Sequence, residues 1–123
     1  MTKILMIEDE DAFGFAVKRF FEAEGYEYDI ANTEVQALAK YKEKRHDVVL
    51  IDLDFKGRHG FDTFEKIKEV DENIRIVAIS AFGEKEELDR ADELGAKGFM
   101  VKIKPGQDIL FYIKDIVDKA LEN

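Results

Sequence analysis

The chain has 123 residues, of which 46% are hydrophobic and none is cysteine. This length and composition suit one globular domain with one core, and they exclude a disordered tail, disulfide bonds and thiol chemistry. The net charge of −9 argues against nucleic acid or an acidic membrane surface as a direct partner. No stretch is long enough to span a bilayer and no signal sequence precedes the first strand, so we expect a cytoplasmic protein with no membrane contact.

Short apolar runs alternate along the chain with stretches whose apolar residues recur at helical spacing. Strands are predicted at residues 3–7, 26–31, 47–52, 74–80 and 98–103. Amphipathic helices are predicted between them, with their apolar stripes over residues 13–21, 33–44, 61–70 and 84–94. Gly25 is expected to stop the first helix, and Pro105 to occupy the first position of the last.

Two of the predicted elements have unusual compositions. The third strand contains the unbroken run VVLI at residues 48–51, which is typical of a strand buried on both faces of a parallel sheet. The helix over residues 84–94 is weak, because its apolar face has only Leu88, Ala91 and Leu94 and the rest is mostly charged. Such a helix buries little surface, so we expect it to shift at low energetic cost.

Five strands alternating with five helices predict an α/β fold, with a parallel sheet covered by helices on both faces. Right-handed crossovers leave few topologies for such a chain, and the flavodoxin-like strand order 2-1-3-4-5 is the one we expect. The predicted architecture is therefore a three-layer (βα)5 domain that occupies residues 1–123.

Polar side chains stand where four of the predicted strands end: Glu8, Asp9, Asp52, Ser80 and Lys102. We expect them to meet, because the carboxyl ends of parallel strands share one edge of the sheet, where such folds bind ligands. Three crowded carboxylates repel one another unless they bind a cation, and oxygen ligands without His or Cys favour Mg²⁺. A metal, a nucleophilic carboxylate at Asp52, a hydroxyl and an ammonium together suit phosphoryl transfer.

Each of these residues also has an ordinary structural explanation. Glu8 and Asp9 could merely favour the start of the first helix, and Asp52 could cap a turn. Ser80 could be a backbone cap, and Lys102 a solvated charge at a strand end. These explanations cover the residues one at a time, but they do not account for the gathering of all these groups at one edge.

The sequence resembles the receiver domain of bacterial two-component response regulators over essentially its whole length. ILMIEDED at residues 4–11 is similar to the family's first strand with its acidic pair, and DVVLIDLDFKGRHG at residues 47–60 to its phosphoacceptor strand and loop. IVAISA at residues 76–81 resembles the strand that ends in the family's Ser or Thr, and GAKGFMVK at residues 95–102 the strand that ends in its lysine. Each match is short, and their order and spacing together make the resemblance specific.

The resemblance implies that Asp52 accepts a phosphoryl group from a phosphohistidine, with Lys102 and Ser80 as the other catalytic residues. It also implies that Mg²⁺ or Mn²⁺ binds Glu8, Asp9, Asp52 and the backbone carbonyl of Asp54. After phosphorylation, Ser80 is expected to bond the new group while Phe99 turns inward. This two-state shift is expected to reshape the surface of the fourth helix, fifth strand and fifth helix.

The implied partners are a sensor histidine kinase or histidine phosphotransfer protein as donor, and a downstream protein target. The chain ends with the fifth predicted helix, so we expect no attached output domain and no direct DNA binding. A homodimer through the reshaped surface is a further expectation. We expect a signalling switch and not a turnover enzyme, and Phe111, on the polar side of the last helix, is a candidate for the partner face.

The segment after the site lysine departs from the family's pattern. The family has a proline directly after its lysine, where this chain has Ile103, so we expect a trans bond and a reshaped loop. A cis bond before a residue other than proline costs about 2.5–4 kcal/mol. An alternative alignment pairs Lys104 and Pro105 with the family's Lys-Pro. Lys102 is preferred because it keeps the spacing from Phe99.

The loop after the acceptor also departs from the pattern, with Lys56 where the family usually has proline. Lys56 and Arg58 could lend positive charge to a phosphoryl group, but we expect both to be solvated. His46 and His59 have no counterpart in the family and are expected at the surface.

Two other functions remain as alternatives. Asp52-Leu53-Asp54 also resembles the DxD motif of haloacid-dehalogenase-type phosphatases. The motif lies on the third predicted strand instead of the first, lacks the usual Thr or Val after it, and leaves no room for a cap domain. The chain could also be a receiver-like binding module that is never phosphorylated, which the full set of site residues disfavours.

Overall fold

The apolar runs of the sequence form one five-stranded parallel sheet in the order β2-β1-β3-β4-β5. The computed structural model describes residues 1–9, 11–57, 59–102 and 108–122. Its strands are β1 (Lys3–Ile7), β2 (Glu27–Ala31), β3 (Val48–Asp52), β4 (Ile76–Ser80) and β5 (Gly98–Val101). The predicted flavodoxin-like strand order is confirmed.

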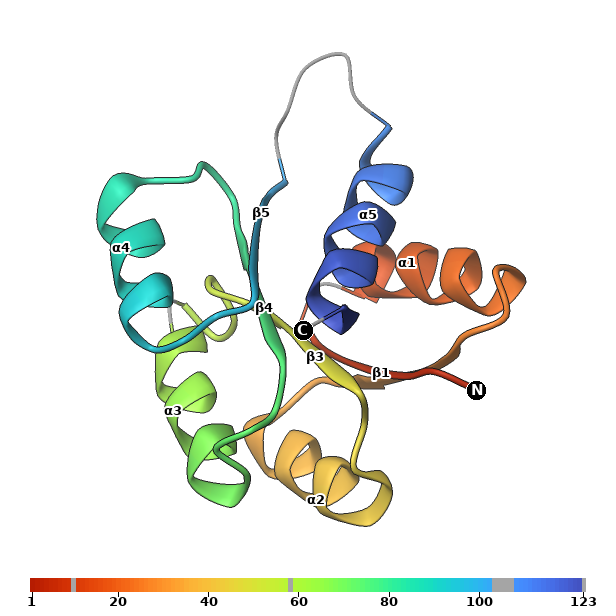
Figure 1. Ribbon diagram of the computed structural model, residues 1–123, viewed down its shortest axis with the longest axis horizontal. Coiled ribbons are helices and arrows are strands. Elements are labelled where there is room, and N and C mark those ends of the chain that lie inside the picture. The colour runs from red at the N-terminus through yellow and green to blue at the C-terminus, as the bar shows by residue number, and fades with distance from the viewer. Residues whose placement is uncertain (10, 58, 103–107, 123) are drawn as a thin grey trace.

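Five helices cover the two faces of this sheet (Figure 1). They are α1 (Asp11–Ala23), α2 (Glu34–Lys44), α3 (Gly60–Val70), α4 (Lys85–Glu93) and α5 (Ile109–Leu121). Helices α1 and α5 pack on one face, and α2, α3 and α4 on the other. No helix in the described ranges is long and apolar enough to cross a membrane.

Strand β3 shows why an unbroken apolar run forms a central strand. Val48 and Leu50 belong to the core beneath α1 and α5, whereas Val49 and Ile51 belong to the core beneath α2 and α3. Successive side chains of a strand point to opposite faces, so a strand covered on both sides needs apolar residues at every position. All five residues of β3 are buried, as the sequence predicted.

The ends of the first and last helices differ in how well the sequence predicted them. Gly25 follows α1 with a φ of +91°, a conformation that glycine adopts without steric cost, and the predicted stop is confirmed. The last helix begins at Ile109, later than predicted. Asp108 caps it by accepting a hydrogen bond from the backbone N of Leu110 at 3.0 Å, because a carboxylate can satisfy a free N–H of the first turn. Pro105 lies outside the described residues.

The prediction that His46 lies at the surface is wrong. Its side chain is buried between the end of α2 and the start of β3, with its ring stacked on Tyr41. The ring can be buried because Nε2 lies 2.8 Å from Oδ2 of Asp29 on β2, which provides a hydrogen-bond partner inside the protein. His59 is exposed, as expected.

Helix α4 is as weakly packed as its composition predicted. Ala91 is its one buried residue, and Leu88 remains 46% exposed. Ala91 contributes to a small apolar cluster with Leu53 and Ala78, separate from the two larger cores. Figure 1 shows α4 at the rim of the molecule, beyond β4 and β5.

Candidate functional site

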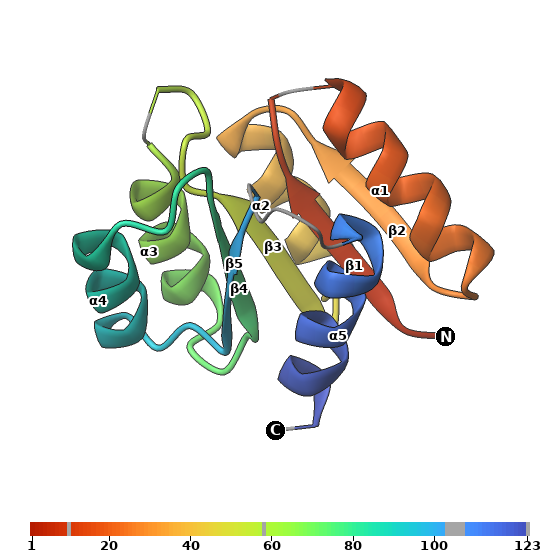
Figure 2. The same cartoon turned by 90° about the horizontal axis from the view of Figure 1, so that it is seen from above.

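The site lies at the carboxyl edge of the sheet, where the chain leaves β1 and β3 on the same side (Figure 2). Asp52, the last residue of β3, is 2% exposed, and Glu8, directly after β1, is 1% exposed. The Nζ atom of Lys102, which follows β5, lies 2.5 Å from Oδ2 of Asp52 and 3.4 Å from Oε2 of Glu8. The predicted convergence of these three residues is therefore present.

The environment of Lys102 keeps its ammonium charged. Burial by itself lowers the pKa of this group, but the hydrogen bond to Asp52 and the charges of Asp52 and Glu8 outweigh burial, so the pKa lies above its ordinary value. The ring of Phe13, from α1, stands 4.7 Å from Nζ and contributes a cation–π contact. Lys102 is held beside β4 by its own backbone N, which donates to the carbonyl of Ser80 at 2.8 Å. The ammonium is thus positioned to balance carboxylate charge.

The loop after β3 closes around the second oxygen of Asp52. The backbone N of Asp54 donates to Oδ1 of Asp52 at 2.8 Å. The carbonyl of Asp54, expected as a metal ligand, accepts a hydrogen bond from the N of Gly57 at 3.1 Å. Both carboxylate oxygens of Asp52 therefore have hydrogen-bond donors, one from the loop and one from Lys102.

The two residues of the acidic pair point to different partners. Glu8 is buried beside Lys102, whereas Asp9 is exposed, and its Oδ2 accepts a hydrogen bond from the backbone N of Lys56 at 3.1 Å. Lys56 is exposed with a φ of +52°, and Arg58 lies outside the described residues. Asp9 thus joins the end of β1 to the loop that follows the acceptor strand.

The predicted metal ligands provide only oxygen donors, which are the ligands that Mg²⁺ prefers. Glu8 and Asp52 come together with the Lys102 ammonium between them, while Asp9 is turned to the loop. Over the described ranges, no three His, Cys, Asp or Glu side chains are arranged as a metal site. The donor chemistry of these residues therefore suits Mg²⁺, and the described side chains are not gathered into a ligand set.

Ser80 is the last residue of β4 and lies at this edge of the sheet, but its hydroxyl bonds to helix α4 and to the turn before it. The side chain is fully buried, and its Oγ donates to Oε1 of Glu87 on α4 at 2.7 Å. The same Oγ accepts a hydrogen bond from the backbone N of Gly83 at 2.9 Å. Sequence patterns did not single out Glu87, because a charged residue in the first turn of a charged helix carries no distinguishing signal.

The predicted switch residue Phe99 and the predicted partner residue Phe111 both contact apolar neighbours. Phe99 on β5 is half-buried and packs against the small cluster of Leu53, Ala78 and Ala91 beneath α4. Phe111 is 56% exposed, and its ring rests edge-on against Phe20 of α1, with centroids 5.3 Å apart. Phe111 therefore lies on the side of α5 that faces α1.

Comparison with known proteins agrees with this geometry. A model of the response regulator receiver domain matches residues 4–114. Sporulation initiation phosphotransferase F of Bacillus subtilis (strain 168) is 34% identical over 94 residues, which are 76% of this chain and 76% of that protein. Chemotaxis protein CheY of Thermotoga maritima is 31% identical over 101 residues, or 81% of this chain and 84% of that protein.

A solved structure extends the likeness to three dimensions. The non-phosphorylated HemR receiver domain from Leptospira biflexa superposes with a TM-score of 0.87 at 26% identity, covering 100% of this chain and 96% of that one. A CheY-like receiver domain protein from Methanospirillum hungatei JF-1, 24% identical with a TM-score of 0.81, shares the fold. These matches favour the receiver reading of Asp52-Leu53-Asp54 over the phosphatase one.

Proposed function

The chain belongs to the family of response regulator receiver domains, and from this membership we propose that Asp52 is its phosphoacceptor. One observation carries the assignment to this residue. Asp52 is a buried carboxylate at the end of the central strand, with the Lys102 ammonium 2.5 Å from one oxygen. A cation held there is placed to neutralise a phosphoryl group that arrives at the same carboxylate.

We propose that the donor is the phosphohistidine of a sensor histidine kinase or a phosphotransfer protein. A carboxylate oxygen of Asp52 attacks phosphorus, the bond from phosphorus to the imidazole nitrogen breaks, and the electron pair remains on that nitrogen. Lys102 then bonds the outer oxygens of the phosphoryl group in place of the Asp52 oxygen. The chain acts once per phosphoryl group, as a switch.

Glu8, Asp9, Asp52 and the carbonyl of Asp54 would hold Mg²⁺ or Mn²⁺. When bound, the metal supplies positive charge to the oxygens of the transferring group. Glu8 is already buried beside the acceptor, and Asp9 is held by a hydrogen bond from the loop that follows the acceptor strand. Movement of Asp9 away from Lys56 would complete the set.

The output of the switch is proposed to be protein binding or onward transfer of the phosphoryl group. The two named relatives act in sporulation initiation, as a phosphotransferase, and in chemotaxis. Ser80 bonds to α4 and Phe99 lies on β5, so the surface of α4, β5 and α5 is the proposed face for a target or a second copy. The predicted cytoplasmic location and the extent of the domain over residues 1–123 stay predictions.

Intact-mass measurement after incubation with acetyl phosphate and Mg²⁺ tests the proposal. We expect a single phosphate adduct on the wild-type chain and none on Asp52→Asn. An adduct that persists in the variant would reject Asp52 as the acceptor. Steady hydrolysis of many equivalents of a phosphomonoester would instead favour a phosphatase, and a wild-type chain that takes no adduct would favour the binding module.

Phe111 is proposed to contact the phosphoryl donor, because it is a large exposed aromatic on α5 beside α1. We expect Phe111→Ala to slow transfer from a purified sensor kinase that phosphorylates the wild-type chain, by about 10-fold, the effect of a moderate hot spot. Phosphorylation by acetyl phosphate should be unchanged. Val35→Ala, which removes a 78% exposed apolar side chain on α2, is the matched control. Equal kinase transfer in both variants would remove Phe111 from the partner face.

A further inference from the structure

The single hydrogen of the Ser80 hydroxyl is committed to helix α4. A serine hydroxyl has one O–H donor, and that of Ser80 points to Oε1 of Glu87 at 2.7 Å. While this bond exists, Ser80 cannot donate to a phosphoryl oxygen on Asp52. The bond is charge-assisted and its donor is fully buried, both of which strengthen it.

The turn between Ser80 and α4 holds the hydroxyl from its other side. The backbone N of Gly83 donates to Oγ of Ser80 at 2.9 Å. Gly83 has a φ of +71°, and a Cβ atom there would come 2.7 Å from Cγ2 of Val101, so the turn is fitted closely against β5. Ser80 is therefore held between a fixed donor in the turn and an acceptor on the helix.

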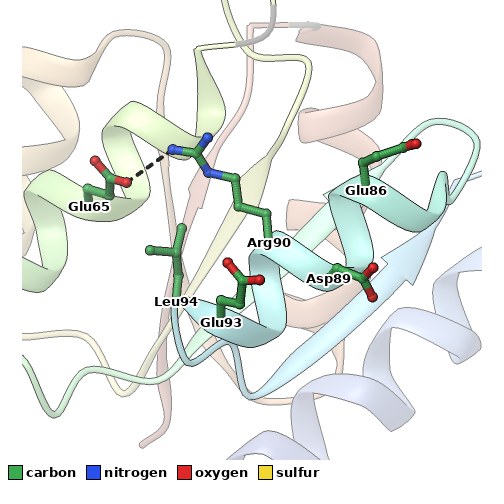
Figure 3. Close-up of a pocket in the computed structure, with 6 residues that line it drawn as sticks. All are labelled: Glu65, Glu86, Asp89, Arg90, Glu93 and Leu94. Atoms are coloured by element: carbon green, nitrogen blue, oxygen red, sulfur yellow. Dashed lines mark hydrogen bonds and ion pairs between the residues drawn. The ribbon is translucent and has the colours of Figure 1, made fainter.

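Helix α4 has few other attachments. Ala91 is its one buried residue, and Glu84 at its start makes no side-chain cap hydrogen bond. Figure 3 shows Arg90 reaching across to Glu65 of α3, and that ion pair, 3.1 Å long, joins two side chains that are each about half exposed. Exposed ion pairs contribute little to stability.

The neighbouring surface does not compensate for these weak attachments. An open groove of about 470 Å³ lies along α4 beside α3. Its lining is mostly charged: Glu65, Glu86, Asp89, Arg90, Glu93 and Leu94. The Ser80–Glu87 bond is thus the most buried polar attachment that the structure describes between α4 and the sheet.

We infer that Glu87 is a positioning residue that latches the unphosphorylated state, by holding the Ser80 hydroxyl on α4 and away from Asp52. The inference rests on the proposed function of Asp52. A phosphoryl group on Asp52 competes with the Glu87 carboxylate for one hydrogen, so when it captures Ser80 it releases α4. By linkage, the free energy of the latch opposes phosphorylation, and phosphorylation opposes the latch by the same amount.

Glu87→Ala removes the acceptor and keeps a good helix former. We expect the initial rate of phosphorylation by acetyl phosphate and Mg²⁺ to rise roughly 3- to 10-fold, the range for losing a hydrogen bond to a charged group at a partly exposed position. Glu87→Gln should give a smaller rise, because its amide oxygen still accepts but is neutral. Glu86→Ala is the matched control, since it removes the same charge from an exposed neighbour in the same turn.

Two readouts separate the latch from a general effect on α4. In a Ser80→Ala background, the ratio of rates with and without Glu87→Ala should fall to about one, because Glu87 acts through that hydroxyl. In the metal-free, unphosphorylated protein, the NMR amide resonance of Gly83 should move in Glu87→Ala and stay in place in Glu86→Ala.

Each outcome decides the question. If the wild-type chain takes up phosphate, and Glu87→Ala and Glu86→Ala do so at equal rates, the latch is overturned and the proposed function stays intact. An acceleration that persists in the Ser80→Ala background also overturns it, because Glu87 then acts by another route. Failure of the wild-type chain to take up phosphate overturns the proposed function, and the latch with it.

Discussion

Lys102 is the cation on which the charge balance of the site depends. Two buried carboxylates, Glu8 and Asp52, both lie within hydrogen-bond distance of its ammonium. Without it they would repel each other in a poorly solvated position, where unpaired charge is costly. A lysine suits the task, since its compact ammonium sits between two acceptors and can exchange a carboxylate oxygen for a phosphoryl oxygen.

Lys102→Met should slow phosphorylation by acetyl phosphate about 10²- to 10³-fold, the usual cost of losing one charge-stabilising donor. The adduct would be followed by intact mass over time. Lys104→Met is the matched control. It also tests the alternative alignment, in which Lys104 is the site lysine, and Lys104 lies outside the described residues. A larger loss from Lys104→Met would transfer the role of the site lysine to that residue.

His46, unlike Lys102, has a structural role and lies outside the proposed site. Its ring is buried, Nε2 pairs with Asp29, and Nδ1 has no hydrogen-bond partner in the described part of the chain. The residue precedes β3 at the amino edge of the sheet, whereas Asp52 ends the same strand at the carboxyl edge. It should therefore affect stability and not phosphorylation.

His46→Ala is expected to lower the free energy of unfolding by about 2–4 kcal/mol, through the cavity and the lost partner of Asp29. Urea denaturation would measure the change. His59→Ala, at an exposed position, should stay within about 0.5 kcal/mol of wild type. Equal effects of the two substitutions would contradict the structural role of His46.

At the scale of elements, the loop from β3 to α3 is fitted to the acceptor by close backbone packing. Gly60 opens α3, and a Cβ atom there would come 2.5 Å from the carbonyl oxygen of Asp52 and 2.6 Å from Cα of Leu53. Both neighbours are backbone atoms, which cannot move aside without shifting the acceptor strand. Glycine is needed at this position because of space, not because of its φ angle.

Gly60→Ala should destabilise the protein by about 1–3 kcal/mol, as overpacking does, and should also slow phosphorylation, because the clash is with Asp52 itself. Denaturation and intact-mass kinetics measure the two effects. Gly57→Ala lies in the same loop with open space around it, so it should show only the strain of its φ of +72°. A normal phosphorylation rate in Gly60→Ala would argue that the loop adapts freely.

Helices α4 and α5 differ in how they are anchored. Helix α5 buries Ile113, Val117 and Ala120 against the sheet, whereas α4 buries Ala91. The element nearest the proposed switch is therefore also among the least tightly packed in the described chain. Elements that move are drawn from the low-stability parts of a fold, and α4 meets that condition.

At the scale of the whole molecule, we expect the acidic edge of the sheet to make stability depend on divalent cations. A ligand that binds the folded state and not the unfolded state stabilises it, by about 1.4 kcal/mol at ten times its dissociation constant. We expect saturating Mg²⁺ to raise the melting temperature by about 3–6 °C, and Asp9→Asn to reduce this gain. Thermal melts at matched ionic strength would measure it. An equal gain in Asp9→Asn would exclude Asp9 as a ligand.

The sequence by itself determined the order of elements and the edge at which the site forms. The run at residues 48–51 has one stable environment, a strand buried on both faces, and parallel strands bring their ends together. The sequence alone therefore places Asp52, Glu8 and Lys102 at one edge of the sheet, because strand ends are local features that parallel pairing brings together.

Only the tertiary structure decided which side chains meet across elements. The partner of Ser80 is Glu87, His46 is buried against Asp29, and Phe111 rests on Phe20, and no local pattern predicts these pairs. Each depends on how one element is rotated and shifted against another. That arrangement is set by the packing of the cores as a whole, which periodicity along the chain does not encode.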